Sequence, residues 1–250
     1  MVSSGILPAR MDHTPPVAIL CGGRGTRLQE HTRTIPKALV EIGGLPILWH
    51  VIRLYAHAGF REFVLCTGHL GDQIAAFVAG HGWPEGVAVT CVDTGADTPT
   101  GGRLRAAAAH LEGGARFCAT YADGVADVDL RRLLAFHAAH DGAATMTVVR
   151  PELQFGVTEL EDGDRVTGFR EKPRSEHWIN GGFFVFDRAV LDRLAPEDVL
   201  ERAPLEGLAA DGELRAFRHD GFWDCMDTYK DAVLLNDLWS SGAPPWRTWS

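Results

Sequence analysis

Apolar positions in the first half of the chain recur with two different spacings. Short, mostly apolar runs predict buried strands, and they occupy 17–20, 62–66, 87–92 and 115–121. Helix-like periodicity or alanine-rich composition fills the intervening segments 46–59, 72–81, 102–111 and 130–140, and Asp72 is placed to cap the second of these helices. Strands that alternate with helices predict βαβ units. The expected fold is therefore α/β and Rossmann-like, with a mainly parallel central sheet flanked by helices.

The second half of the chain has a different pattern. An Asp-Gly turn lies between the runs 155–160 and 165–173, which is typical of a β-hairpin. The sequence then predicts strands at 181–187 and 212–219 and helices at 188–195, 204–211 and 228–240. We expect a small β-rich portion beside the main sheet, and a tail at 242–250 docked on the surface. The expected organisation is an N-terminal extension at 1–16 and one domain at 17–250.

Composition excludes several classes of protein. The chain has 250 residues, 46% hydrophobic and 23% charged, with a formal net charge of −9. An acidic chain is not expected to bind nucleic acid or anionic membranes broadly. The five cysteines lie far apart with no C-x-x-C spacing, which favours neither a disulfide framework nor a zinc site. No run predicts a membrane span or a cleaved leader, so a cytoplasmic protein is expected.

The segment "CGGRGTR" at 21–27 directly follows the first predicted strand. Glycine allows a ligand to approach the backbone closely, and Arg24, Thr26 and Arg27 offer donors that suit phosphate. The spacing matches neither the P-loop nor the dinucleotide fingerprint. From spacing alone, a glycine-rich turn without a ligand is an equal alternative.

Three charged residues outside this segment are candidates for phosphate chemistry. Lys37 follows Pro36 ten residues after Arg27, and Asp123 directly follows the predicted strand at 115–121. A carboxylate at the carboxyl end of a strand in an α/β sheet is well placed to hold magnesium against substrate phosphates. Asp227 lies in the aromatic segment "GFWDCMDT". Its structural alternative is the cap of the last helix, as Asp129 is expected to cap the helix at 130–140.

Two further segments offer polar groups that follow predicted strands. Glu171 and Lys172 lie in "FREKP", and Asn180 lies beside two glycines in "WINGGFF". Together they could supply a carboxylate for hydroxyl groups, a cation for phosphate and an amide for orientation.

The whole ordered set of segments resembles the sugar-1-phosphate nucleotidyltransferases, and most of all the glucose-1-phosphate cytidylyltransferases. The similarity rests on "GGRGTRL", "PKALVEIGG", "PILWHV", "VDTG", "TGGRL", "YADGVAD", "FREKP", "INGGFFVF" and "GFWDCMDT", and it spans Val17 to the C-terminal tail. It implies the nucleotide-diphosphosugar transferase fold and a Mg²⁺-dependent reaction. CTP and a sugar 1-phosphate, with glucose 1-phosphate as the first candidate, would give a CDP-sugar and pyrophosphate by in-line attack on the α-phosphorus.

Matched position by position, the resemblance implies roles for individual residues. The implied nucleotide site comprises Leu20, Gly22, Gly23, Gly25, Thr26, Arg27, Lys37 and Gly102. The implied catalytic residues are Arg27, Lys37, Asp123, Lys172 and Asp227. Arg27 would contact the leaving pyrophosphate, and Lys37 would lie near the reacting phosphate. Asp123 and Asp227 would hold the magnesium ion. Lys172 would bind the sugar phosphate, while Glu171 and Asn180 would bind sugar hydroxyls.

The chain departs from the family pattern in two places. Cys21 stands where alanine commonly precedes the glycine pair, and the segment 80–92 is shorter than its counterpart, from which relatives often build part of their oligomer and nucleotide enclosure. Homo-oligomerisation and the choice of base therefore stay open, as do UTP, dTTP and another sugar or cyclitol phosphate. A non-catalytic nucleotide-sugar-binding regulator is the alternative from another class. The joint presence of Lys37, Asp123, Lys172 and Asp227 favours an enzyme.

Overall fold

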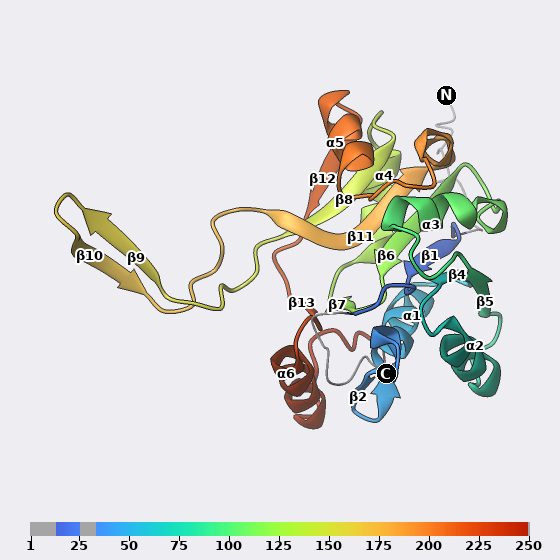
Figure 1. Cartoon of the computed structure of the whole chain (residues 1–250), viewed down its shortest axis with the longest axis horizontal. Helices are drawn as coiled ribbons and strands as arrows, with labels where there is room; N and C mark the ends of the chain where they lie inside the picture. The colour runs from blue at the N-terminus through green and yellow to red at the C-terminus, as the bar shows by residue number, and fades with distance from the viewer. Residues whose placement is uncertain (1–13, 26–33, 250) are drawn as a thin grey trace, which may run out of the picture.

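The central element of the fold is a mixed seven-stranded sheet, seen in a computed structural model that describes residues 14–25 and 34–249 (Figure 1). Its strand order is β12-β8-β11-β6-β1-β4-β5. These strands are β1 (Val17–Leu20), β4 (Glu62–Thr67), β5 (Ala88–Asp93), β6 (Arg116–Tyr121), β8 (Ala144–Val149), β11 (Ile179–Asp187) and β12 (Leu214–Arg218). Only β11 runs against the other six. The predicted mainly parallel α/β sheet is confirmed.

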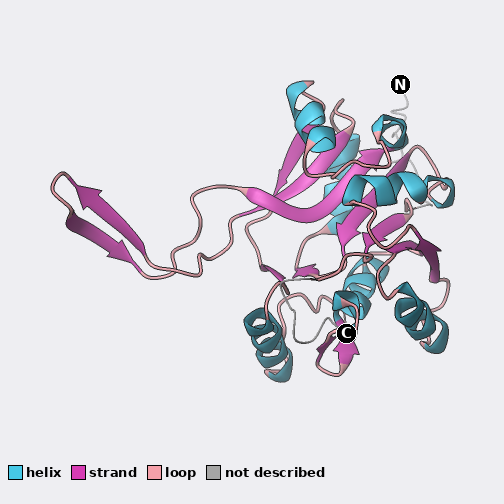
Figure 2. Cartoon of the chain, viewed as in Figure 1, coloured by secondary structure: helices cyan, strands magenta, loops and turns pink. Residues whose placement is uncertain are grey.

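Helices cover both faces of this sheet because its central strands are apolar on both sides (Figure 2). In β1, Val17 and Ile19 pack into one core, while Ala18 and Leu20 pack into the other. The first core contains residues of α1 (Ile47–His57), α2 (Gly71–Gly80), α4 (Leu130–Ala138) and α6 (Tyr229–Ser240). The second contains residues of α3 (Thr100–Ala106), α5 (Ala203–Ala210) and the 3-10 helix η4 (Arg188–Arg193). Across the described residues, no helix is both long and apolar enough to cross a bilayer.

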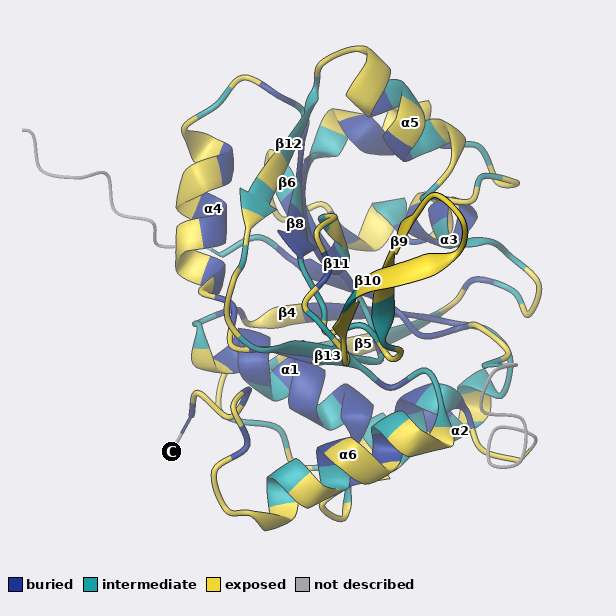
Figure 3. Cartoon of the chain, turned by 90° about the vertical axis from the view of Figure 1, so that its left-hand side faces the viewer, coloured by how far each residue is buried: buried dark blue, intermediate teal, exposed yellow. Residues whose placement is uncertain are grey.

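Shorter elements connect these layers. They are the 3-10 helices η2 (Lys37–Leu39) and η3 (Ala108–His110), and the short strands β2 (Glu41–Ile42), β3 (Leu45–Pro46), β7 (Gly124–Ala126) and β13 (Trp223–Cys225). The predicted hairpin is confirmed as β9 (Val157–Glu161) and β10 (Arg165–Arg170), which pair with each other and project from the body of the molecule (Figure 1). Most of its surface is exposed, as Figure 3 shows.

Two local predictions about helices need correction. The second helix begins at Gly71, and its N-cap is Leu70 in a left-handed conformation, so Asp72 lies in the first turn and is not the cap. The segment predicted as a helix at 188–195 is the 3-10 helix η4.

The C-terminal segment is not a surface tail, contrary to the prediction. Trp246 is fully buried and Trp249 is 6% exposed, and both belong to the core that packs on α1. The Trp246 Nε1–H donates to Nδ1 of His50 at 3.4 Å, while the other ring nitrogen of His50 lies 2.9 Å from the carbonyl of Ile42. Burial lowers the pKa of His50 to about 4, so the ring is neutral and can accept this bond. The residues around Trp246 are polar or proline, so nothing in the sequence indicated that this tryptophan would be buried.

Candidate active site

The largest concentration of polar candidate residues lies where two neighbouring parallel strands end. Strands β1 and β6 pair in register, with Leu20 opposite Tyr121, so the segments that follow them leave from the same edge of the sheet. The segments that begin at Cys21 and Ala122 therefore start side by side. A cavity of about 660 Å³ opens at this edge. Its polar lining includes Lys37, Tyr121, Asp123, Asn180, Glu201 and Asp227.

Three charged residues from distant parts of the chain meet in this cavity. Lys37 begins η2, Asp123 follows β6, and Asp227 lies between β13 and α6. The Lys37 Nζ donates to Oδ2 of Asp123 at 2.5 Å and to Oδ1 of Asp227 at 2.6 Å. Their side chains are 15%, 25% and 34% exposed, respectively, so the group is largely buried. The two carboxylates thus share one cation.

The charge of Lys37 depends on these two neighbours. Burial lowers the pKa of Lys37, but the charges and hydrogen bonds of Asp123 and Asp227 outweigh burial and raise that pKa above its ordinary value. The ammonium therefore stays charged throughout the neutral range, where it can meet an anionic ligand.

The carboxylate of Asp227 is not the cap of the last helix. Thr228 is the N-cap of α6, and it forms a capping box with Asp231. The backbone N–H of Asp227 donates to Oδ2 of Asp231 at 3.0 Å, which holds Asp227 at the end of the helix with its carboxylate toward Lys37. The structural alternative for Asp227 is therefore wrong.

The arrangement of Asp123 and Asp227 fits a magnesium ion held with the help of a substrate. Both carboxylates already contact one positive centre. Within residues 14–25 and 34–249, no group of three or more His, Cys, Asp or Glu side chains forms a metal cage. Magnesium typically takes one or two protein carboxylates and completes its shell with phosphate oxygens and water. A pair of carboxylates beside a cavity of about 660 Å³, with room for a substrate phosphate, therefore suits this ion.

Arg103 supports the glycine-rich segment that follows β1. It was not among the residues predicted from the sequence. Arg103 is only 3% exposed. Its guanidinium donates to the carbonyl oxygens of Gly22, Thr67 and Gly95, each at 2.9 Å, and to the carbonyl of Ala96 and the hydroxyl of Thr94. These five acceptors are uncharged oxygens that lie at the end of β4 or just after β1 and β5. Arg103 therefore links the ends of β1, β4 and β5 by hydrogen bonds.

The neighbouring glycines of this loop have different reasons to be glycine. A Cβ on Gly22 would lie 2.0 Å from Nη1 of Arg103, so Gly22 makes room for the guanidinium. A Cβ on Gly23 would meet nothing within 4 Å, and Gly23 lines the cavity. Of these two glycines, Gly23 is the one that leaves space for a ligand.

Other predicted nucleotide-site residues divide into three groups. Leu20 and Gly25 line the cavity. Gly102 packs closely against the backbone, because a Cβ there would lie 2.0 Å from the carbonyl oxygen of Pro196. Its small size therefore serves the packing of α3. Thr26 and Arg27 lie outside the described residues. The nucleotide contacts themselves stay predictions.

The residues predicted to bind the sugar phosphate are divided between two neighbouring hollows. Asn180 lines the main cavity, whereas Lys172 lines an adjacent hollow of about 420 Å³ together with Arg150 and Arg174. Trp223 lines both hollows, which makes them neighbours. Glu171 is exposed at the base of the hairpin and lines neither. Their joint action on one sugar phosphate stays a prediction.

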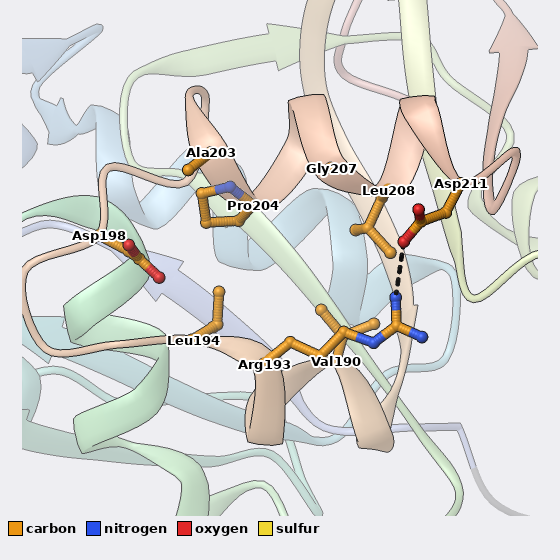
Figure 4. Close-up of a pocket in the computed structure, with 9 residues that line it drawn as sticks. All are labelled: Val190, Arg193, Leu194, Asp198, Ala203, Pro204, Gly207, Leu208 and Asp211. Carbon is orange, nitrogen blue, oxygen red and sulfur yellow. Dashed lines mark ion pairs between the residues drawn. The ribbon is translucent and has the colours of Figure 1, made fainter.

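A further hollow between η4 and α5 does not share residues with the main cavity (Figure 4). Its lining is largely apolar, and Arg193 there points toward Asp211, with which it pairs at 3.8 Å. A second carboxylate, Glu213, lies 2.8 Å from the same guanidinium. Because two carboxylates already hold this guanidinium, Arg193 is not placed to bind phosphate.

Comparison with known proteins shows the family to which the chain belongs. Residues 17–215 match the family described as nucleotidyl transferase. The chain belongs to the nucleotidyl transferase family. It is 42% identical to the glucose-1-phosphate cytidylyltransferase of Salmonella typhi, over 92% of this chain and 98% of the relative, and 40% identical to a probable glucose-1-phosphate cytidylyltransferase of Bacillus subtilis over the same shares.

Two solved structures share the fold at lower sequence identity. The crystal structure of HddC from Yersinia pseudotuberculosis superposes with a TM-score of 0.71 and 20% identity, over 90% of this chain and all of that chain. A putative glucose-1-phosphate thymidylyltransferase from Bacillus anthracis gives a TM-score of 0.66, again with 20% identity, over 89% of this chain and 94% of that chain. Both solved chains therefore share the fold described above.

Proposed function

We propose that this nucleotidyl transferase joins CTP to glucose 1-phosphate, giving CDP-glucose and pyrophosphate. The observation that carries the proposal is the convergence of Lys37, Asp123 and Asp227 in a cavity at the carboxyl ends of β1 and β6. Ligands of α/β sheets bind at this edge. The choice of CTP and glucose 1-phosphate is supported by the identity of 42% to the Salmonella typhi enzyme over nearly its whole length.

The reaction requires positioning and charge neutralisation more than covalent chemistry. A phosphate oxygen of the sugar 1-phosphate attacks the α-phosphorus of the triphosphate, and the bond from that phosphorus to the pyrophosphate oxygen breaks. Lys37 is proposed to contact the reacting phosphate, because its ammonium is charged and faces the cavity. Gly23 leaves the backbone open to the phosphates, and Arg27 is proposed to contact the leaving pyrophosphate.

Asp123 and Asp227 are proposed to hold Mg²⁺ in the working enzyme. When bound, magnesium neutralises part of the phosphate charge that would repel the incoming nucleophile. Lys37, which lies between the two carboxylates, must then release at least one of them and turn toward phosphate. Lys172 is proposed to bind the sugar phosphate from the adjacent hollow, while Glu171 and Asn180 bind sugar hydroxyls.

The proposal also covers location and assembly. A nucleoside triphosphate substrate is consistent with the cytoplasmic location expected from the sequence. A homo-oligomer is consistent with the projecting β9–β10 hairpin, on which Leu160, Val166 and Phe169 are more than half exposed. Apolar side chains on a projecting hairpin gain stability when another chain covers them.

Pyrophosphate release tests the proposed reaction directly. The enzyme is incubated with Mg²⁺ and each pair from CTP, UTP, dTTP or GTP with glucose 1-phosphate or mannose 1-phosphate. We expect CTP with glucose 1-phosphate to give the highest kcat/KM, and Lys37→Met to abolish release, which excludes a contaminating activity. The GTP and mannose 1-phosphate pair is included because the chain is 32% identical, over 86% of its length, to a probable mannose-1-phosphate guanylyltransferase of Oryza sativa. That relative is longer, and the match covers 62% of it. No release with any pair would favour the non-catalytic regulator.

A further inference from the structure

A chain of hydrogen-bonded side chains lines the same cavity as Lys37, and the reaction described above does not use most of it. Its members are Asn180 in β11, Tyr121 at the end of β6, Glu201 before α5 and Thr100 at the start of α3. The Tyr121 hydroxyl lies 2.5 Å from Oε1 of Glu201, and the Thr100 hydroxyl lies 2.7 Å from its Oε2. Nδ2 of Asn180 lies 3.1 Å from the Tyr121 oxygen.

The direction of each bond in this chain follows from Glu201. An ionised carboxylate can only accept hydrogen bonds, so Tyr121 and Thr100 must both donate their single hydroxyl proton to Glu201. Burial, followed by the charge of Glu201, raises the pKa of Tyr121, so the phenol keeps its proton. With that proton committed, the Tyr121 oxygen can only accept from its other neighbour. Asn180 must therefore turn its NH₂ group, and not its carbonyl, toward Tyr121.

The other end of the Asn180 amide is fixed as well. Its Oδ1 accepts from the backbone N–H of Gly182 at 2.9 Å. The amide is thus held at both ends, and the second N–H of Nδ2 is left over for the cavity. A ligand beside Asn180 can therefore accept a hydrogen bond from Nδ2 of Asn180, whereas the hydroxyl proton of Tyr121 is already donated to Glu201.

We infer that Glu201 is a positioning residue: by accepting the Tyr121 proton it keeps the Tyr121 oxygen an acceptor, and this oxygen and the Gly182 N–H together hold the Asn180 amide with an N–H donor toward the sugar phosphate. The ligand group that Asn180 meets must then be an acceptor oxygen, such as a sugar hydroxyl that uses its lone pair. This inference rests on the proposed function for the identity of the ligand. The fixed polarity of the amide follows from the hydrogen bonds alone.

Steady-state kinetics with substituted enzymes test the role of Glu201. We expect Glu201→Ala and Tyr121→Phe each to raise the KM for sugar 1-phosphate about tenfold, which corresponds to about 1.4 kcal/mol and is at the upper end for one hydrogen bond. The KM for nucleotide should change less than twofold. Glu201→Gln is the conservative variant. Its amide oxygen can accept the Tyr121 proton while its NH₂ group donates to Thr100, so it should stay within about threefold of the parent. Glu206→Ala, an exposed glutamate on α5, is the matched control and should change neither constant.

Deoxy sugar phosphates distinguish a loss of the Asn180 hydrogen bond from a general loss of stability in the variants. One of the monodeoxy analogues should lose about tenfold in kcat/KM with the parent enzyme, because it lacks the acceptor for Asn180. The same analogue should lose almost nothing further in Glu201→Ala or Asn180→Ala. Equal penalties in parent and variants, or an equal rise of both KM values, would overturn the inference while the parent's turnover still supports the proposed function.

Nuclear magnetic resonance tests the inference even if no sugar phosphate is turned over. The side-chain NH₂ resonances of Asn180, assigned by their loss in Asn180→Asp, should shift in Glu201→Ala and Tyr121→Phe. They should stay in place in Glu206→Ala. Unshifted resonances in Glu201→Ala would show that Asn180 is oriented without Glu201, and the inference would be wrong whatever the substrate is.

Discussion

Two cations lie at the same edge of the sheet, and they are held in opposite ways. Arg103 lies beneath the glycine loop, is almost fully buried and donates only to uncharged oxygens. Lys37 lies in the cavity between the carboxylates of Asp123 and Asp227. The first has its donors committed to backbone and hydroxyl groups of three segments. Lys37 is held by two carboxylates that could bind a metal ion in its place.

This difference separates the fixed part of the site from the exchangeable part. A planar guanidinium with several well-placed acceptors is rigid, and no ligand can compete for it. An ammonium on a flexible stem between two carboxylates can leave when another cation takes its place. We therefore expect substitutions at Arg103 to act mainly on folding, and substitutions in the Lys37 group to act mainly on turnover and metal binding.

The largest expected effect follows replacement of the buried cation. Arg103→Met removes five hydrogen bonds to a charged donor and should lower the free energy of unfolding by roughly 3 kcal/mol or more. Arg103→Lys restores the charge but not the fork of donors, and it should recover less than half of the loss. Urea unfolding measures both. Arg105→Met, in the same helix but exposed and with one backbone contact, is the control and should cost about 1 kcal/mol at most. Similar values for both methionine variants would contradict the role given to Arg103.

Replacement of one carboxylate in the exchangeable group should act on turnover. Asp227→Asn keeps the shape of the side chain but halves the negative charge that faces the metal, and it should lower kcat about 100-fold, or roughly 2.7 kcal/mol of barrier. Its melting temperature should change little, because the side chain is one-third exposed. Asp224→Asn, three residues earlier, is the matched control for pyrophosphate release. If both variants retain full turnover, the metal assignment for Asp227 fails.

Substitutions of Gly22 and Gly23 test whether the fixed part, around Arg103, can be separated from the part of the site that binds ligands. Gly22→Ala forces a Cβ against the Arg103 guanidinium, and overpacking of this kind costs about 1–3 kcal/mol of stability. Gly23→Ala meets no atom within 4 Å, so its stability should stay within about 0.5 kcal/mol while the KM for nucleotide rises. Thermal unfolding and kinetics on the same preparations distinguish them. A stable Gly22→Ala, or an unchanged KM in Gly23→Ala, would remove the distinction.

The smallest expected effect concerns magnesium in the absence of substrates. In the parent protein an added ion competes with Lys37 for the two carboxylates, whereas in Lys37→Met it does not. Millimolar Mg²⁺ should therefore stabilise Lys37→Met more than the parent, by about 1 kcal/mol when the ion is in several-fold excess over its Kd. Thermal shift measurements with and without EDTA show the difference. The double variant Lys37→Met with Asp123→Asn should lose the gain, and an equal shift in parent and variant would exclude exchange at this position.

The sequence predicted the elements of the site better than their contacts. The strand at 17–20, the loop after it and Asp123 follow from local patterns, because parallel strands bring their carboxyl ends to one edge. The family resemblance placed Asp227 with Asp123 at a magnesium ion. No signal in the sequence predicted the ion pair between Lys37 and Asp227, 190 residues later. Arg103 was missed because a helical pattern does not show that a charged residue will be buried against backbone carbonyls. Lys172 was expected beside Asn180, but the hairpin geometry that places it in a separate hollow is not encoded in short-range spacing.

The packing of Trp246 against His50 has a consequence for how the chain folds as it is made. The two residues are separated by 196 positions, and at about 5–20 residues per second the ribosome needs roughly 10–40 s to add them. During that interval the side of α1 that receives Trp246 has no indole to cover it, so the nascent chain exposes an incomplete core. Chaperone capture should therefore be strongest on chains stalled before residue 246, and it should fall once this tryptophan clears the exit tunnel.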